Sequence, residues 1–140
     1  MAIKEQMLAK VPLFAGLTAK ELDHISSLLT QLDVPAGTTL IRQGEVGKEF
    51  MVIVKGTVEV VHNLEVLRTL GEGDHFGEIA LLDGGRRTAS VVAKTPVTIE
   101  VASQQEFLGL LNEAPEIAVK LLPALARRVR ELNAHAVDVS

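Results

Sequence analysis

The sequence lacks cysteine, any membrane-length apolar run and an excess of positive charge. Because none of its 140 residues is cysteine, a disulfide framework and thiolate chemistry are excluded. The apolar run Phe50–Val54 is strand-sized, far short of the roughly 20 residues that a membrane-spanning helix needs. A net charge of −4 at pH 7 gives no general reason to expect a nucleic-acid partner. With no signal-peptide pattern at the N-terminus, these features predict a soluble cytoplasmic protein without a membrane span.

The residue patterns of common catalytic sites are also missing. The histidines are scattered, and no His-x-His pattern followed by a glutamate and a later histidine supports a metal-binding jelly roll of the cupin type. No Walker lysine follows a glycine loop, and no Ser-His-Asp set is readable. The sequence therefore predicts neither an enzyme nor a metal site.

Two helical segments flank a central region of another kind. Thr18–Glu21 forms a capping box, and apolar residues recur at helical spacing from Ala19 to about residue 31. Near the C-terminus, Ser103–Glu106 is a second capping box, and Pro115 suits the first turn of a last helix that runs to about residue 136. Pro123 lies inside this helix, where a proline is expected to kink or locally break it.

Between the helical segments the apolar pattern becomes that of short strands. The turns between them carry glycine, proline and asparagine, and Asn63 is expected to turn a hairpin. Short strands at even spacing indicate a closed β-roll. The expected strands are residues 38–42, 50–54, 57–62, 65–70, 88–93 and 97–102.

Residues 76–91 have the features of a small anion site. Gly77 allows the backbone to approach a ligand closely, and Glu78–Leu82 can form a short helix that Gly84 and Gly85 end. The start of a helix offers N–H groups and a positive dipole end, which suit a phosphate. Beyond it, Arg86 or Arg87 can fork onto phosphate oxygens, but only one can enter the site because successive strand residues point to opposite faces.

This stretch resembles the phosphate-binding cassette of cyclic nucleotide-binding domains, whose pattern is F-G-E-[LI]-A-L-L-x-x-x-P-R-[TSA]-A-[ST]-V. Phe76–Leu82 and Arg87–Val91 match the pattern, and Arg86 stands where the family usually has proline. The resemblance implies an α+β, mainly β fold: an eight-stranded antiparallel β-roll, or jelly roll, with N-terminal helices, a short phosphate-binding helix and two C-terminal helices. It implies a single domain over residues 1–140, with a helical segment at 1–32, the β-roll at 33–102 and C-terminal helices at 103–137.

The resemblance also implies a ligand, a nucleoside 3′,5′-cyclic monophosphate, and roles for individual residues. Arg87 would bind the phosphate, and Arg86 would face solvent. Further phosphate donors would be the Thr88 hydroxyl and backbone N–H groups, those of Ala89 and of Ile79 or Ala80. Glu78 would accept the ribose 2′-hydroxyl, and Gly77 would leave room for the sugar. The base would pack against Val60 and Leu67 and be capped by the apolar Leu132.

The identity of the base and the output of the domain stay open on this reading. We expect cAMP as the ligand, with a cGMP-preferring sensor and a ligand-free interaction domain of the same fold as the alternatives, because a threonine such as Thr88 occurs with either nucleotide. The last helix carries an apolar stripe from Ile117 to Leu132 that could form a homodimer and relay occupancy. We expect no direct DNA binding, and the effector protein or domain is unknown.

Overall fold

The structure is a computed structural model that describes residues 3–77, 82 and 85–136. By its internal contacts the chain divides into two compact units. One unit comprises residues 1–26 and 110–140, and the other comprises residues 27–109.

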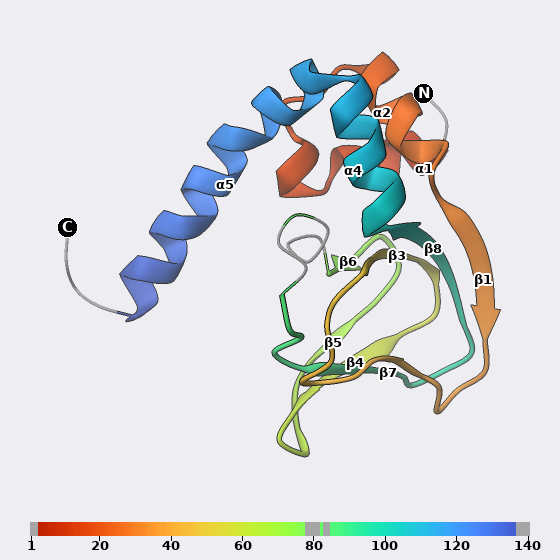
Figure 1. Ribbon diagram of the computed structural model, residues 1–140. Helices are drawn as coiled ribbons and strands as arrows, with labels where there is room; N and C mark the ends of the chain where they lie inside the picture. The colour runs from red at the N-terminus through yellow and green to blue at the C-terminus, as the bar shows by residue number, and fades with distance from the viewer. Residues whose placement is uncertain (1–2, 78–81, 83–84, 137–140) are drawn as a thin grey trace. The chain divides into compact units, whose positions relative to one another are not determined.

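In the unit of residues 27–109, the described residues form eight antiparallel strands in two four-stranded sheets. Figure 1 shows how the strands are arranged. The first sheet has the order β1-β8-β3-β6, and its strands are β1 (Thr30–Val34), β8 (Val97–Ser103), β3 (Glu49–Lys55) and β6 (His75–Phe76). The second has the order β2-β7-β4-β5, and its strands are β2 (Thr39–Ile41), β7 (Ser90–Ala93), β4 (Val58–His62) and β5 (Glu65–Leu70). The expected eight-stranded antiparallel roll is thus confirmed.

Alternate residues of the two sheets form one apolar core. Successive side chains of a strand point to opposite faces, so every second residue faces inward. Burying each of these side chains contributes on the order of 1.5–3 kcal/mol to folding. The first sheet supplies Met51, Ile53, Phe76, Val97, Ile99 and Val101, and the second supplies Ile41, Val58, Val60, Val91 and Ala93.

The helices are α1 (Ile3–Ala9), the 3₁₀ helix η1 (Pro12–Phe14), α2 (Ala19–Ser26), α4 (Gln104–Glu113) and α5 (Pro115–Ala136). The two C-terminal helices begin where the capping box and Pro115 predicted. Pro123 lies inside α5, which continues through it, so of the predicted kink or local break the break is wrong and the kink stays a prediction. A proline removes one N–H donor of a helix, and this loss does not end α5. No helix in the described part of the chain is long and apolar enough to cross a membrane.

The N-terminal helical segment is shorter than its apolar spacing predicts. Helix α2 ends at Ser26 instead of near residue 31, and β1 begins at Thr30. Residues 30–34 pair along their whole length with Val97–Val101 of β8. The hydrogen bonds of this ladder outweigh the local helical pattern, since tertiary context commonly overrides propensity.

The capping box at the start of α2 includes an ion pair with α5. Glu21 Oε1 accepts from the Thr18 N–H at 2.9 Å and from Lys120 Nζ at 2.8 Å, while the Glu21 N–H donates to the Thr18 hydroxyl at 3.2 Å. The hydrogen bond from Lys120, followed by that from the Thr18 backbone, lowers the pKa of Glu21 below its ordinary value of 4.5. A lowered carboxyl pKa means that this stability is present above the ordinary value and is lost as the pH falls through the lowered one.

We therefore expect Glu21→Gln to destabilise the protein slightly at pH 7, by no more than about 1 kcal/mol, because the pair is partly exposed. Glutamine preserves the capping geometry, so the substitution isolates the charge. Thermal melts of both proteins at pH 7 and pH 3 measure the effect. The difference should close at pH 3, and an equal difference at both pH values would contradict the role of the charge.

Candidate ligand-binding site

Backbone hydrogen bonds hold the arginine-bearing segment 85–87 beside the loop that follows β2. The Gly47 N–H donates to the Gly85 carbonyl, the Arg87 N–H donates to the Glu45 carbonyl, and the Gly44 N–H donates to the Arg87 carbonyl, each at 2.8 Å. Val46 and Arg86 form a β-bridge between them. The G-x-x-G spacing of Gly44 and Gly47 therefore serves to align the segment that carries both arginines.

Arg87 is half-buried, and its guanidinium reaches the start of β3. Its Nη2 donates to the backbone carbonyl of Glu49 at 2.5 Å. A guanidinium presents several N–H donors in one plane, which matches the oxygen spacing of a phosphate. The contact with Glu49 fixes the plane of this fork by a main-chain group, and so the direction of a bound anion would be set by the backbone of β3.

Gly77 lies directly against the same guanidinium. Its φ is +87°, a backbone conformation that favours glycine. A Cβ at this position would lie 2.7 Å from Arg87 Nη1 and 2.7 Å from the Glu49 carbonyl oxygen. The structure therefore brings Gly77 and Arg87 together, as the motif requires, and any side chain at residue 77 would displace the guanidinium.

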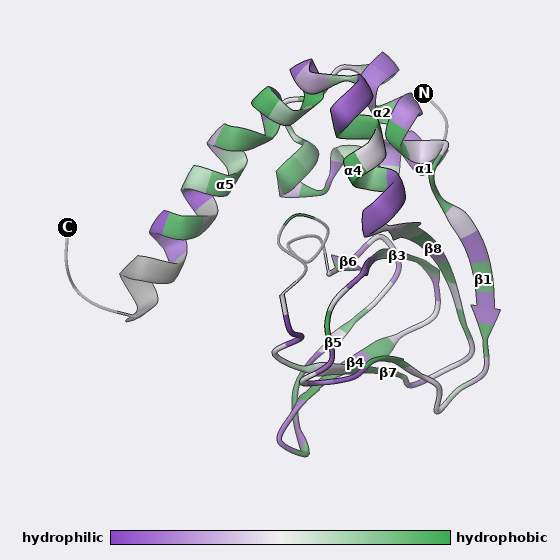
Figure 2. Ribbon diagram, in the orientation of Figure 1, coloured by the Kyte–Doolittle hydropathy of each residue, from purple (hydrophilic) through white to green (hydrophobic). Residues whose placement is uncertain are grey.

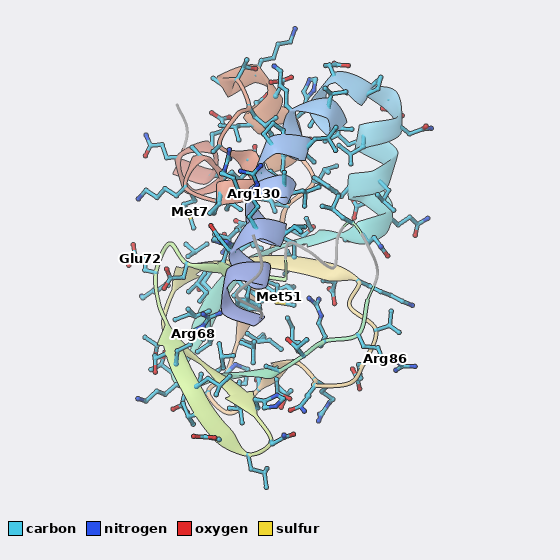
Figure 3. All side chains as sticks on the ribbon, turned by 90° about the vertical axis from the view of Figure 1, so that its left-hand side faces the viewer. Met7, Met51, Arg68, Glu72, Arg86 and Arg130 are labelled. Atoms are coloured by element: carbon cyan, nitrogen blue, oxygen red, sulfur yellow. The ribbon has the colours of Figure 1, made fainter. Side chains whose placement is uncertain are left out.

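The Arg86 side chain points in another direction from that of Arg87 and is more exposed. It is exposed, its Nη1 donates to the Gly44 carbonyl at 2.8 Å, and in Figure 3 its side chain projects away from the ribbon at the outer edge. The expectation that Arg86 faces solvent is confirmed. Its contact with the Gly44 carbonyl gives it a local role in holding the loop.

Thr88 and Ala89 follow Arg87 and differ in their surroundings. Thr88 is exposed, and its carbonyl is 2.8 Å from His62 Nδ1. Ala89 is half-buried and packs against the apolar core. Sequence reasoning missed His62 as a residue near the site, because a histidine at a strand end is unremarkable and lies 26 residues from Thr88.

The two residues expected to pack against a base lie in different environments. Val60 is 8% exposed and belongs to the core, whereas Leu67 is 56% exposed. In the β4–β5 register Val60 pairs with Arg68 and Val61 with Val66, so Leu67 is the additional residue of a β-bulge. The sequence does not reveal this bulge.

Four further expected site residues lie outside the described residues or in the other compact unit. Glu78, Ile79 and Ala80 lie outside the described residues, as does most of the expected short helix. Leu132 lies within α5, in the other compact unit. Among residues 3–77, 82 and 85–136, no cluster of histidine and acidic side chains could hold a metal ion. The described part of the site thus offers one guanidinium and its backbone frame for an anion.

Known proteins resemble this chain over most of its length. The "Cyclic AMP receptor protein" of Thermus thermophilus is 34% identical over 127 residues, which cover 87% of this chain and 59% of the relative. The "CRP-like cAMP-activated global transcriptional regulator" of Mycobacterium tuberculosis is 29% identical and covers 96% of this chain and 62% of the relative. The chain therefore spans about three fifths of the length of these two relatives.

A solved structure agrees with the same fold. The N-terminal domain of a transcriptional regulator from Streptomyces coelicolor has a TM-score of 0.84 and 29% identity, and the likeness covers 96% of both chains. In addition, the family described as "Cyclic nucleotide-binding domain" matches residues 31–114. Because this match spans more than half of the chain and includes both sheets and the arginine-bearing segment, the chain belongs to the cyclic nucleotide-binding domain family.

Proposed function

We propose that this domain is a sensor that binds cAMP and passes its occupancy through α5 to an effector protein or domain. The observation that carries the proposal is the placement of the Arg87 guanidinium, fixed by the Glu49 carbonyl and packed on Gly77. A charged hydrogen bond from such a group contributes about 1.5–3 kcal/mol. The family is a regulatory ligand-binding domain and not a catalytic one, so the proposal includes no reaction.

In this proposal the remaining site residues act on the phosphate, the sugar or the base. The Thr88 hydroxyl and the N–H groups of Ala89 and of Ile79 or Ala80 donate to the phosphate, and Glu78 accepts the ribose 2′-hydroxyl. Val60, Leu67 and Leu132 contact the base. cAMP is favoured over cGMP because two relatives bear names that include cAMP or cyclic AMP.

Ligand-induced stabilisation tests the proposal. A ligand that binds the folded state alone stabilises it by about 2.7 kcal/mol at a hundred times its Kd. We expect cAMP, but not the open-chain 5′-AMP, to raise the Tm of the full chain. An unchanged Tm at millimolar cAMP, or an equal rise with 5′-AMP, would contradict a cyclic nucleotide site.

We further propose that two copies of the chain form a homodimer through α5. Figure 2 shows hydrophobic and hydrophilic residues alternating along this helix. The apolar side chains of α5 differ in exposure: Ile117 and Leu121 are each 1% exposed, whereas Val129 and Leu122, which lies outside the predicted stripe, are 57% and 59% exposed. Exposed apolar side chains of this kind favour an interface with a second copy. Sedimentation should show a dimer that the double substitution Leu122→Glu, Val129→Glu converts to a monomer; a monomeric wild type, with and without cAMP, would refute the interface.

The proposal places the domain in the cytoplasm and assigns it no contact with DNA of its own. One relative is named a transcriptional regulator, but this chain spans only 62% of it and carries a net charge of −4. Any effect on DNA would require a further domain or a partner.

A further inference from the structure

A continuous chain of hydrogen bonds joins the tip of the β4–β5 hairpin to the segment that precedes β7. His62 Nδ1 lies 2.8 Å from the Thr88 carbonyl oxygen, and His62 Nε2 lies 3.1 Å from Asn63 Nδ2. Gln43 Nε2 donates to Asn63 Oδ1 at 2.9 Å, and the Asn63 N–H donates to Gln43 Oε1 at 3.1 Å. Gln43 also donates its backbone N–H to the Ser90 hydroxyl at 2.9 Å.

The hydrogen-bond partners of His62 indicate which of its ring nitrogens carries the proton. A carbonyl oxygen only accepts, so Nδ1 must carry a proton to bond Thr88. The Asn63 backbone N–H donates to Gln43 Oε1, so Gln43 Nε2 is the group that donates to Asn63 Oδ1. This bond leaves the Asn63 NH₂ group facing His62 Nε2. In this arrangement Nε2 accepts, and the ring carries its proton on Nδ1.

The turn at the hairpin tip holds Asn63 in place for this purpose. Asn63 and Leu64 have φ values of 48° and 68°, and they form the two-residue connection between the paired His62 and Glu65. Two successive positive φ values are typical of a type I′ turn, in which asparagine is a favoured residue. A rigid turn thus anchors the amide that orients the imidazole.

These hydrogen bonds end at one peptide group next to Arg87. The Thr88 carbonyl and the Ala89 N–H belong to the same peptide, and no peptide bond in the described residues is cis. In a trans peptide these two groups point in opposite directions. By holding the carbonyl on one side, His62 sets the direction of the Ala89 N–H on the other.

We propose that His62 is a positioning residue for anion binding, which fixes the Thr88–Ala89 peptide so that its N–H donates to the phosphate of the ligand. The inference rests on the proposed function, because the phosphate is that of the cyclic nucleotide. His62 acts through this peptide without touching the ligand. Arg87, which shares the segment, is held separately by Gly44 and Glu45.

Two substitutions at residue 62 separate positioning from general stabilisation. His62→Leu keeps the bulk and removes the donor, and we expect the Kd for cAMP to rise roughly three- to tenfold, the value of one hydrogen bond. His62→Asn places an amide nitrogen near the position of Nδ1, and we expect it to restore the Kd to within about twofold of the wild type. His24→Leu in α2 is the matched control and should leave the Kd unchanged.

The same hydrogen bonds of His62 can be examined in the absence of ligand. ¹⁵N NMR of the full-length protein should show a protonated Nδ1 and an unprotonated Nε2 for His62, and hydrogen exchange at Ala89 should change in His62→Leu but not in His62→Asn. Equal losses of affinity in both variants, wild-type affinity in both, or a proton on Nε2 would overturn the proposal. If the wild type binds no cyclic nucleotide, the proposed function fails. The tautomer of His62 and the hydrogen exchange of Ala89 then still test whether His62 fixes the Thr88–Ala89 peptide.

Discussion

Arg87→Ala is expected to raise the Kd for cAMP by roughly two to four powers of ten, because in the proposed function it removes the charge-assisted hydrogen bonds of the guanidinium to the phosphate. The free protein should lose little stability. In the free protein the substitution removes the bond to the Glu49 carbonyl, and such a bond contributes about 1 kcal/mol. Titration calorimetry gives the affinity, and a thermal melt gives the stability.

Arg86→Ala is the matched control for Arg87→Ala, because it removes the adjacent guanidinium, which lies at the surface against the Gly44 carbonyl. We expect its affinity for cAMP to stay within about threefold of the wild type, since it loses at most one loop hydrogen bond. If Arg86→Ala abolishes binding and Arg87→Ala does not, the assignment of the two arginines is reversed.

Gly77→Ala is expected to impair binding without removing any ligand-contacting side chain. The new methyl group would lie 2.7 Å from both Arg87 Nη1 and the Glu49 carbonyl oxygen, so the guanidinium must move. Because the carbonyl belongs to β3 and cannot yield easily, we expect at least a tenfold weaker affinity for cAMP. The unfavourable φ should also cost about 1–3 kcal/mol of stability.

Gly73→Ala separates these two effects. Gly73 has a φ of +86°, nearly that of Gly77, but a Cβ there meets no atom within 4 Å. Both variants should lose stability in denaturant melts, Gly77→Ala the more because of its overlap with the Glu49 carbonyl, and only Gly77→Ala should lose affinity. Equal affinity in the two variants would show that Gly77 serves the backbone alone and not the placement of Arg87.

The sequence predicts the fold well where local and long-range signals agree. The hairpin of β4 and β5 follows from its apolar pattern and from Asn63, and the starts of α4 and α5 follow from Ser103 and Pro115. The end of α2 is mispredicted because the partner of residues 30–34 is β8, nearly 70 residues away in the sequence, and helical spacing contains no trace of it.

The site shows the same division. Adjacent residues in a motif identify Arg87 over Arg86, and the proximity of Gly77 to Arg87 accords with it. What the sequence cannot indicate are main-chain partners such as the Glu49 carbonyl, and contacts between loops such as that of His62 with Thr88. These depend on how distant turns are brought together, and a β-bulge such as that at Leu67 changes which side chain faces which.

Both the family membership and the placement of Arg87 support the central proposal, which is that the domain binds a cyclic nucleotide. Titration calorimetry of the full chain with cAMP, and in parallel with cGMP, tests it most directly. We expect saturable binding of one cAMP per chain with a Kd below about 1 mM, tighter than that of cGMP. Absence of measurable binding by either nucleotide in that range would contradict the account.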